Sequence, residues 1–124
     1  MEIVMSNMNK TWILDLDGTI VKHNGYKDDG FDTLIPGADK LLSQIGDDDM
    51  VIFITSRKKN ECGKMTEEFL HANNIRYDHI IYEAPYGERI LINDNKPSGL
   101  RMSYAFAPKR DEVADLDIKV DDTI

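Results

Sequence analysis

Short, continuous runs of mostly apolar residues recur along the chain and are separated by polar stretches. Such runs, without the alternation of a half-exposed strand, are typical of strands that are covered on both faces. We therefore predict five buried strands, at residues 12–16, 50–54, 79–82, 89–92 and 103–107.

Two helical stretches lie between these runs. Residues 37–46 follow Pro36 and end at Gly46, and residues 60–74 carry apolar side chains at helical spacing, although Gly63 weakens that helix by about 1 kcal/mol. Alternating strands and helices imply right-handed crossovers. The expected fold is α/β: a Rossmann-like three-layer sandwich around one parallel five-stranded sheet.

The chain is expected to form one domain at residues 11–124, because 124 residues bury one core and not two. Residues 1–10 are interpreted as an N-terminal lead-in. The tail after about residue 110 is acid-rich, and it is expected to be irregular unless its spaced apolar residues pack as a last helix or an edge strand.

A hairpin is predicted within residues 21–37, a segment that we call the flap. It contains Asn24-Gly25, the strongest short hairpin signal, and Asp29-Gly30 as a second turn. The intervals between the predicted strands are too short for a cap domain, so the expected site is open. Four flap residues are candidates for substrate contact or exposed decoration: Lys22, His23, Tyr26 and Lys27.

The charge balance argues against a nucleic-acid partner. The chain has 15 basic and 23 acidic residues and a net charge of −8, whereas proteins that bind nucleic acid usually carry a basic face. The single cysteine, Cys62, forms no internal disulfide, so the cytoplasm is the expected location. Residues 1–9 lack the pattern of a signal peptide, and no apolar run approaches the roughly 20 residues of a membrane span. We therefore expect no membrane partner.

Polar residues follow three of the predicted strands. In parallel sheets ligands bind beyond the carboxyl ends of the strands, so these residues are expected to lie at one edge. Taken singly, each of them also suits a turn or a helix cap. They are Asp15 and Asp17, then Thr55, Ser56 and Arg57, then Asn93, Asp94 and Asn95.

Two carboxylates at the end of a buried strand are costly unless their charge is compensated. A divalent cation would compensate it, and oxygen-only ligands from Asp15, Asp17 and Asp94 suit Mg²⁺. Zinc is disfavoured, because the chain has one cysteine and its three histidines lack ligand spacing.

Three segments resemble motifs one, two and four of the haloacid dehalogenase-like hydrolase superfamily. They are DLDGTI at residues 15–20, VIFITSR at residues 51–57 and ILINDN at residues 90–95. The resemblance implies an aspartyl-phosphate mechanism, with Asp15 as nucleophile and Asp17 as general acid and base. It also implies that Thr55 bonds the phosphoryl group and that Asp94 helps to hold Mg²⁺.

The basic residue of the superfamily's third motif has no regular match. Arg89 is the preferred substitute, and Lys96 and Lys64 are the alternatives. The fourth motif carries Asn93-Asp94 where the superfamily has a double acid. The expected catalytic residues are therefore Asp15, Asp17, Thr55 and Arg89, and the expected substrate-binding residues are Gly18, Ser56, Arg57 and Lys96.

These features predict a Mg²⁺-dependent phosphomonoester hydrolase with a small phosphorylated substrate. Residues 55–85 also resemble small capless phosphatases of bacterial capsule or sugar-phosphate pathways, which favours a phosphorylated sugar or polyol. The irregular third and fourth motifs leave a non-catalytic phosphate-binding or regulatory domain as an alternative. A phosphomutase is disfavoured because an open site admits water. The sequence does not determine whether the chain forms a homo-oligomer.

Overall fold

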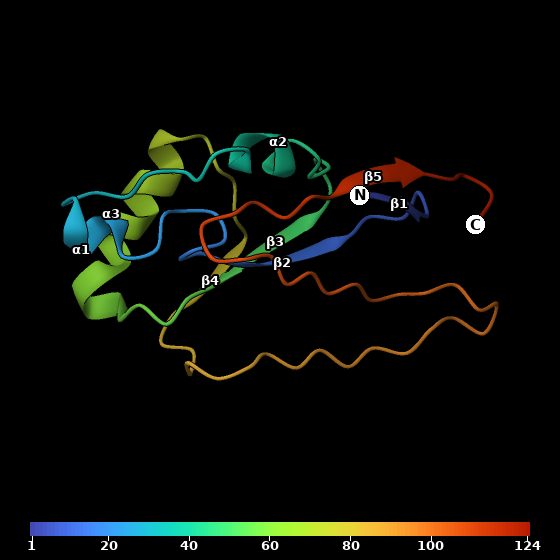
Figure 1. Cartoon of the computed structure of the whole chain (residues 1–124). Coiled ribbons are helices and arrows are strands. Elements are labelled where there is room, and N and C mark those ends of the chain that lie inside the picture. Colours follow the sequence, from blue (N-terminus) through green and yellow to red (C-terminus); the bar gives the residue numbers. More distant parts are fainter.

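The computed structural model describes residues 1–124 and contains five strands and three helices (Figure 1). None of the helices is long and apolar enough to cross a membrane. In chain order the elements are β1 (Glu2–Met5), β2 (Thr11–Asp15), α1 (Gly25–Asp28), α2 (Ala38–Leu42), β3 (Met50–Ile54), α3 (Lys59–Ala72), β4 (His79–Ile81) and β5 (Asp117–Val120).

The three-stranded parallel sheet β2-β3-β4 is the centre of the molecule. Its register pairs Asp15 with Ile54, and Ile54 with Ile81, so the three strands end at the same level. The core beside this sheet contains Phe53 and Leu70, which are both completely buried. The polar residues that follow β2 and β3 are thereby delivered to one edge of the sheet.

The predicted five-stranded sheet is wrong. The structure has one sheet of three parallel strands and a separate sheet of two, β1 and β5. Residues 89–92 and 103–107 form no strand. Ile90 and Ile92 are 85% and 90% exposed, so the apolar run that predicted a buried strand has no neighbouring strand to cover it.

The three-layer arrangement is also wrong. All three helices lie on one side of β2-β3-β4 in Figure 1. The strands follow one another across the sheet in chain order, so successive right-handed crossovers reach the same face. A helix on the other face would need a strand order that reverses direction.

Both chain ends take part in the second sheet. β1 lies within the stretch interpreted as a lead-in, and it pairs in parallel with β5, with Glu2 opposite Asp117. Of the two alternatives for the tail, the structure has the edge strand. Leu116 belongs to the main core, and Ile3 and Ile118 pack against it.

The flap contains no hairpin turn at Asn24-Gly25. Asn24 adopts a left-handed φ of 55° and precedes the short helix α1, and the backbone N–H of Asp28 donates to the Asn24 carbonyl at 2.9 Å. An antiparallel bridge between Val21 and Leu34 closes the loop at its base. The helical turn places the ring of Tyr26 against Arg57, a contact that a two-residue hairpin turn does not predict.

Residues 84–110, which we call the arm, leave the body after β4 and return to it before β5 (Figure 1). At the tip, the N–H of Gly99 donates to the Lys96 carbonyl at 2.8 Å, and the N–H of Lys96 donates to the Leu100 carbonyl at 3.0 Å. Gly99 has a φ of +93°. These bonds close a tight turn with a glycine bulge at residue 99, as in a hairpin.

The Asp49 carboxylate joins the loop before β3 to the start of β2. It accepts hydrogen bonds from the N–H of Lys10 (2.8 Å), the N–H of Gly46 (2.8 Å) and the indole Nε1 of Trp12 (2.9 Å). Burial acts to raise the pKa of Asp49, but these bonds outweigh it and hold the pKa below its ordinary value.

We expect Asp49→Asn to lower the free energy of unfolding by about 1–3 kcal/mol at pH 7, because a charged acceptor of three bonds is lost. A depressed folded-state pKa contributes stability above the unfolded pKa, which is about 4, and this contribution disappears as the pH falls through the folded value. Urea denaturation of both proteins from pH 7 to pH 2 should show the difference shrinking below about pH 4. A difference that is constant with pH would contradict this account.

Candidate functional site

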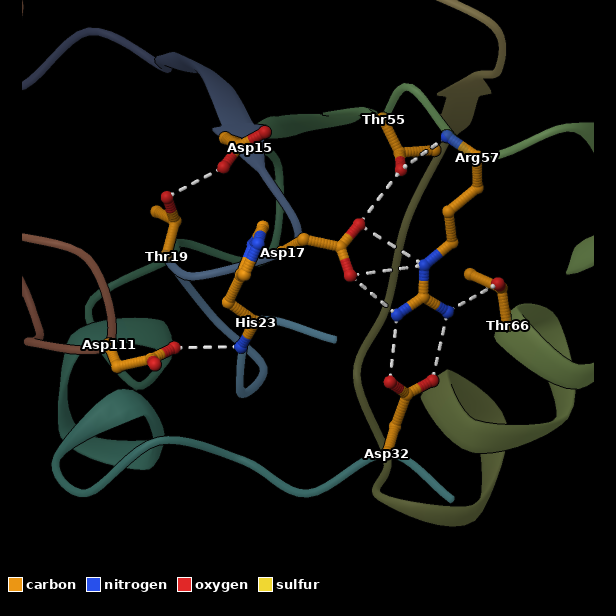
Figure 2. Close-up of polar contacts among 9 residues, drawn as sticks. All are labelled: Asp15, Asp17, Thr19, His23, Asp32, Thr55, Arg57, Thr66 and Asp111. Atoms are coloured by element: carbon orange, nitrogen blue, oxygen red, sulfur yellow. Dashed lines mark hydrogen bonds and ion pairs between the residues drawn. The ribbon is translucent and has the colours of Figure 1, made fainter. Parts of the chain in front are cut away.

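A cluster of charged and hydroxyl side chains lies at the carboxyl ends of β2 and β3 (Figure 2). Asp15 is the last residue of β2, Asp17 follows two residues later, and Thr55 and Arg57 follow β3. The parallel register brings these two strand ends together. The sequence predicts this part of the site by strand position alone.

Asp15 presents a half-open carboxylate. Its side chain is 34% exposed, and its two oxygens have different partners. Thr19 Oγ1 donates to Oδ2 at 2.8 Å, and Arg89 Nη1 donates to Oδ1 at 2.7 Å. The carboxylate is thus oriented by a hydroxyl and a guanidinium while one side of it remains accessible.

Asp17 is more tightly held than Asp15. Arg57 Nη2 lies 2.8 Å from Oδ1, and Arg57 Nε lies 3.2 Å and 3.3 Å from the two carboxylate oxygens. The hydroxyl of Thr55, which is buried, donates to Asp17 Oδ2 at 3.3 Å. Thr55 therefore contacts the second aspartate and is not directed at open space.

Arg57 lies in a buried ion-pair network rather than at the surface. Its Nη1 and Nη2 donate to the two oxygens of Asp32 at 2.9 Å and 2.7 Å, and Nη1 also donates to Thr66 at 2.9 Å. The ring of Tyr26 lies 4.2 Å from its Cζ. Burial acts to lower the pKa of Arg57, but Asp32 and Asp17 outweigh it and raise the pKa above its ordinary value.

All five N–H donors of the Arg57 guanidinium point at Asp17, Asp32 or Thr66. None of them is left for a substrate oxygen. Arg57 was expected to bind substrate, and the structure shows it in contact with the neighbouring carboxylates of Asp17 and Asp32. Arg57 positions Asp17, and Ser56 lies half-buried in the short connection before it.

Gly18 makes the turn that follows Asp17. Its φ is +81°, and a Cβ there would meet Arg110 Cγ at 3.1 Å. Its N–H donates to the Val21 carbonyl at 2.7 Å, so this donor is used inside the turn. The requirement for glycine at this position therefore comes from the turn and from the close passage of Arg110, at the end of the arm.

Only one of the three basic residues considered for the third motif contacts Asp15. Arg89 forms the 2.7 Å ion pair described above, and its side chain is 39% exposed. Lys96 lies exposed at the tip of the arm. Lys64 is on the outer face of α3, 4.0 Å from Glu68.

The structure does not bring Asp94 to Asp15 and Asp17. Asp94 is exposed on the arm, because residues 89–92 form no strand that would carry it to the sheet edge. No group of three His, Cys, Asp or Glu side chains is close enough to hold a metal ion. Asp15 and Asp17 are each paired with a guanidinium, so the donor set of this arrangement does not fit Mg²⁺.

Four residues of the site were not identified from the sequence. Thr19 stands four residues after Asp15 in the DLDGTI run, and that spacing was the available signal. Asp32 and Thr66 lie in segments with no local signal for an ion pair. Asp111 accepts a hydrogen bond from the N–H of His23 at 2.7 Å, although the two residues are 88 positions apart in the chain. The N–H of Asp111 donates to the Gly18 carbonyl at 2.8 Å.

The arrangement offers one accessible carboxylate with a cation beside it, and a second carboxylate held in place from behind. The Arg89 guanidinium can bind an anionic group, and an Asp15 oxygen is then presented to that group.

No family model, curated protein or solved structure matches this chain.

Proposed function

We propose that this chain is a phosphomonoester hydrolase that forms an aspartyl-phosphate on Asp15. The observation that carries the proposal is the half-open Asp15 carboxylate at the end of β2, with Arg89 Nη1 2.7 Å from one oxygen and Thr19 Oγ1 2.8 Å from the other. The resemblance of the DLDGTI, VIFITSR and ILINDN segments to a phosphatase superfamily supports the same reaction.

In the proposed first step, Arg89 moves from Asp15 to the oxygens of the incoming phosphate. This exchange lowers the repulsion between a carboxylate and a phosphate dianion. An Asp15 oxygen then attacks phosphorus, an O–P bond forms, and the ester P–O bond breaks. The leaving oxygen takes a proton from the Asp17 carboxyl group, which becomes a carboxylate.

In the second step, water attacks the phosphorus of the aspartyl-phosphate. Asp17 accepts the proton of this water, and inorganic phosphate leaves as Asp15 is restored. Arg57 and Thr55 hold Asp17 in place for both proton transfers through the contacts described above. None of these steps uses a metal ion.

The proposed substrate is a phosphorylated sugar or polyol. The likeness of residues 55–85 to small capless phosphatases supports this class. Two flap residues that were candidates for substrate contact already have partners within the chain, since Lys22 pairs with Asp29 at 2.8 Å and Tyr26 lies on Arg57. The single cysteine supports a cytoplasmic location in this proposal.

A second candidate function is a phosphate-binding or regulatory domain without turnover. The observation that favours it is the Asp17 carboxylate, which three guanidinium contacts and a hydroxyl hold in one position. A carboxylate whose two oxygens already accept these bonds is less free to move toward a substrate. In addition, Asp94, the acidic residue of the segment that resembles the fourth motif, is exposed on the arm and does not belong to the site.

Release of inorganic phosphate separates the two functions. The full chain is assayed with p-nitrophenyl phosphate and a panel of sugar and polyol phosphates, once with Mg²⁺ and once with a chelator. Turnover above background that is lost in Asp15→Asn supports the hydrolase. Background rates throughout, together with measurable binding of inorganic phosphate, support the binding domain. Turnover only with Mg²⁺ would show that the metal-binding arrangement differs from the one described here.

Arg89→Ala is expected to lower kcat/KM by about 10- to 100-fold, because the phosphate oxygens lose their cation. Arg89→Lys should restore part of the rate, since it returns the charge without the two-pronged geometry. The melting temperature should be unchanged, because Arg89 is substantially exposed. Arg101→Ala, at another exposed arginine of the arm, is the matched control. Unchanged kinetics in Arg89→Ala would remove this residue from the mechanism.

A further inference from the structure

The outgoing half of the arm is an apolar strand-like segment without a partner. Every residue from 85 to 99 is exposed. Tyr86, Ile90 and Ile92 are 94%, 85% and 90% exposed, and Leu91 is 54% exposed. On the returning half, Phe106 packs against the main core, so one side of the hairpin is docked and the other is bare. A contiguous exposed patch of this kind marks an interaction surface.

The charge of the arm is opposite to that of the rest of the chain. Residues 84–110 contain five basic and two acidic residues, a net charge of +3, whereas the other 97 residues contain ten basic and 21 acidic residues, a net charge of −11. The surface that best complements the arm is therefore the acidic body of this same protein.

The body also has an edge to which a strand can be added. β2 pairs with β3 on one side only, so its other side presents unpaired backbone groups. Ile13, in the middle of β2, is 47% exposed. Asp47 and Asp48, exposed just before β3, lie near the beginning of β2 because Thr11 pairs with Met50.

We propose that two copies of this chain exchange arms. The apolar residues 90–92 of each copy lie along the β2 edge of the other, where their side chains cover Ile13. The basic residues at the tip of the arm, Lys96 and Arg101, then face the acidic end that carries Asp47 and Asp48. Backbone pairing along a free strand edge supplies affinity, and the charges set the orientation.

A second copy is favoured over a nucleic acid because the exposed residues at the centre of the arm are aliphatic. Ile90, Leu91 and Ile92 offer neither charge for phosphates nor rings for bases. Their burial on an apolar strand edge is the favourable contact available to them. This inference uses no step of the proposed reaction, and its tests measure molecular mass and disulfide linkage rather than release of phosphate.

The first test is the mass of the full chain in solution across a range of concentrations, measured by light scattering after gel filtration. A dimer is expected. Ile90→Asn combined with Ile92→Asn should raise the dissociation constant by at least about tenfold, which corresponds to about 1.4 kcal/mol. These side chains are exposed, so the variant should fold, and its melting temperature checks this. Ile124→Asn, at an exposed isoleucine outside the arm, is the matched control. A monomer at every concentration would overturn the proposal.

The second test identifies the contact. One chain carries Ile13→Cys, another carries Leu91→Cys, and both carry Cys62→Ser. After mixing and mild oxidation, the expected product is a disulfide-linked pair of one chain of each kind. Thr123→Cys replaces Leu91→Cys in the control mixture, which should link far less. If Ile13→Cys and Leu91→Cys link only when both are in the same chain, the arm closes on its own β2 and arm exchange is wrong.

Discussion

Replacing Asp15 with asparagine is expected to reduce the rate of phosphate release by about 1,000-fold or more. Asparagine has nearly the shape of aspartate, and its single amide oxygen can still accept one of the two bonds that Thr19 and Arg89 donate to Asp15. It cannot, however, form an acyl phosphate, because the amide is not a nucleophile toward phosphorus. Steady-state kinetics on the best substrate of the panel measure the loss.

Two comparisons make this result specific. Asp28→Asn removes an exposed carboxylate of α1 and should leave the rate unchanged. The melting temperature of Asp15→Asn should stay close to that of the original chain, because Asp15 is half-open and keeps its neighbours. An Asp15→Asn protein that retains most of its activity would show that hydrolysis does not pass through this carboxylate.

Replacing Asp32 with alanine is expected to cause the largest loss of stability of any single substitution considered for this chain. The Asp32 side chain is 1% exposed, and it accepts bonds from both terminal nitrogens of Arg57. Without it, the buried guanidinium keeps only Asp17 and Thr66. Removal of one partner of a buried ion pair costs about 3–5 kcal/mol, and urea denaturation is the measurement.

The same measurement on a second ion pair provides the control. Asp29 forms an ion pair with Lys22 of similar length, 2.8 Å compared with 2.7 Å between Arg57 and Asp32, but this pair lies at the surface. Asp29→Ala should therefore leave the unfolding midpoint nearly unchanged. A double variant, Asp32→Leu with Arg57→Leu, should recover part of the stability lost in Asp32→Ala, because no unpaired guanidinium remains. Equal effects of Asp32→Ala and Asp29→Ala would mean that the Arg57 network is not buried in solution.

The loss of Asp32 should also be visible in catalysis. Arg57 holds Asp17 through Nη2 and Nε, and it is itself held by Asp32. If Asp17 carries the protons of the reaction, a looser Arg57 should lower kcat more than it raises KM. The two aspartates have different surroundings: Asp15 is open toward the solvent, and Asp17 is restrained from the protein side.

Three of the five predicted strands are found close to their predicted positions. Residues 50–54 coincide with β3, and residues 12–16 and 79–82 overlap β2 and β4. Each of these runs neighbours another in the sheet, so its apolar side chains are covered as the pattern predicts. The runs at 89–92 and 103–107 are also mostly apolar, but they have no strand beside them. An apolar run shows that a segment has side chains that can be buried. It does not show whether the fold places a neighbouring strand where those side chains can be covered.

The sequence by itself determined the residues at the ends of β2 and β3. Asp15, Asp17, Thr55 and Arg57 follow apolar runs that pair in parallel, and strand direction places them at one edge of the sheet. The apolar pattern of a strand and the residues that directly follow it are both local features of the chain, so they can be predicted from the sequence.

Only the tertiary structure decided how these charges are compensated. The sequence predicted a Mg²⁺ ion held with Asp94, whereas the structure pairs Asp17 with Arg57 and Asp15 with Arg89, and leaves Asp94 on the arm. Arg57 is joined to Asp32 across 25 residues, and Arg89 to Asp15 across 74. Such pairs depend on which distant segments pack together, because the cost of burying a charge is offset only by the particular partner that the whole fold brings to it.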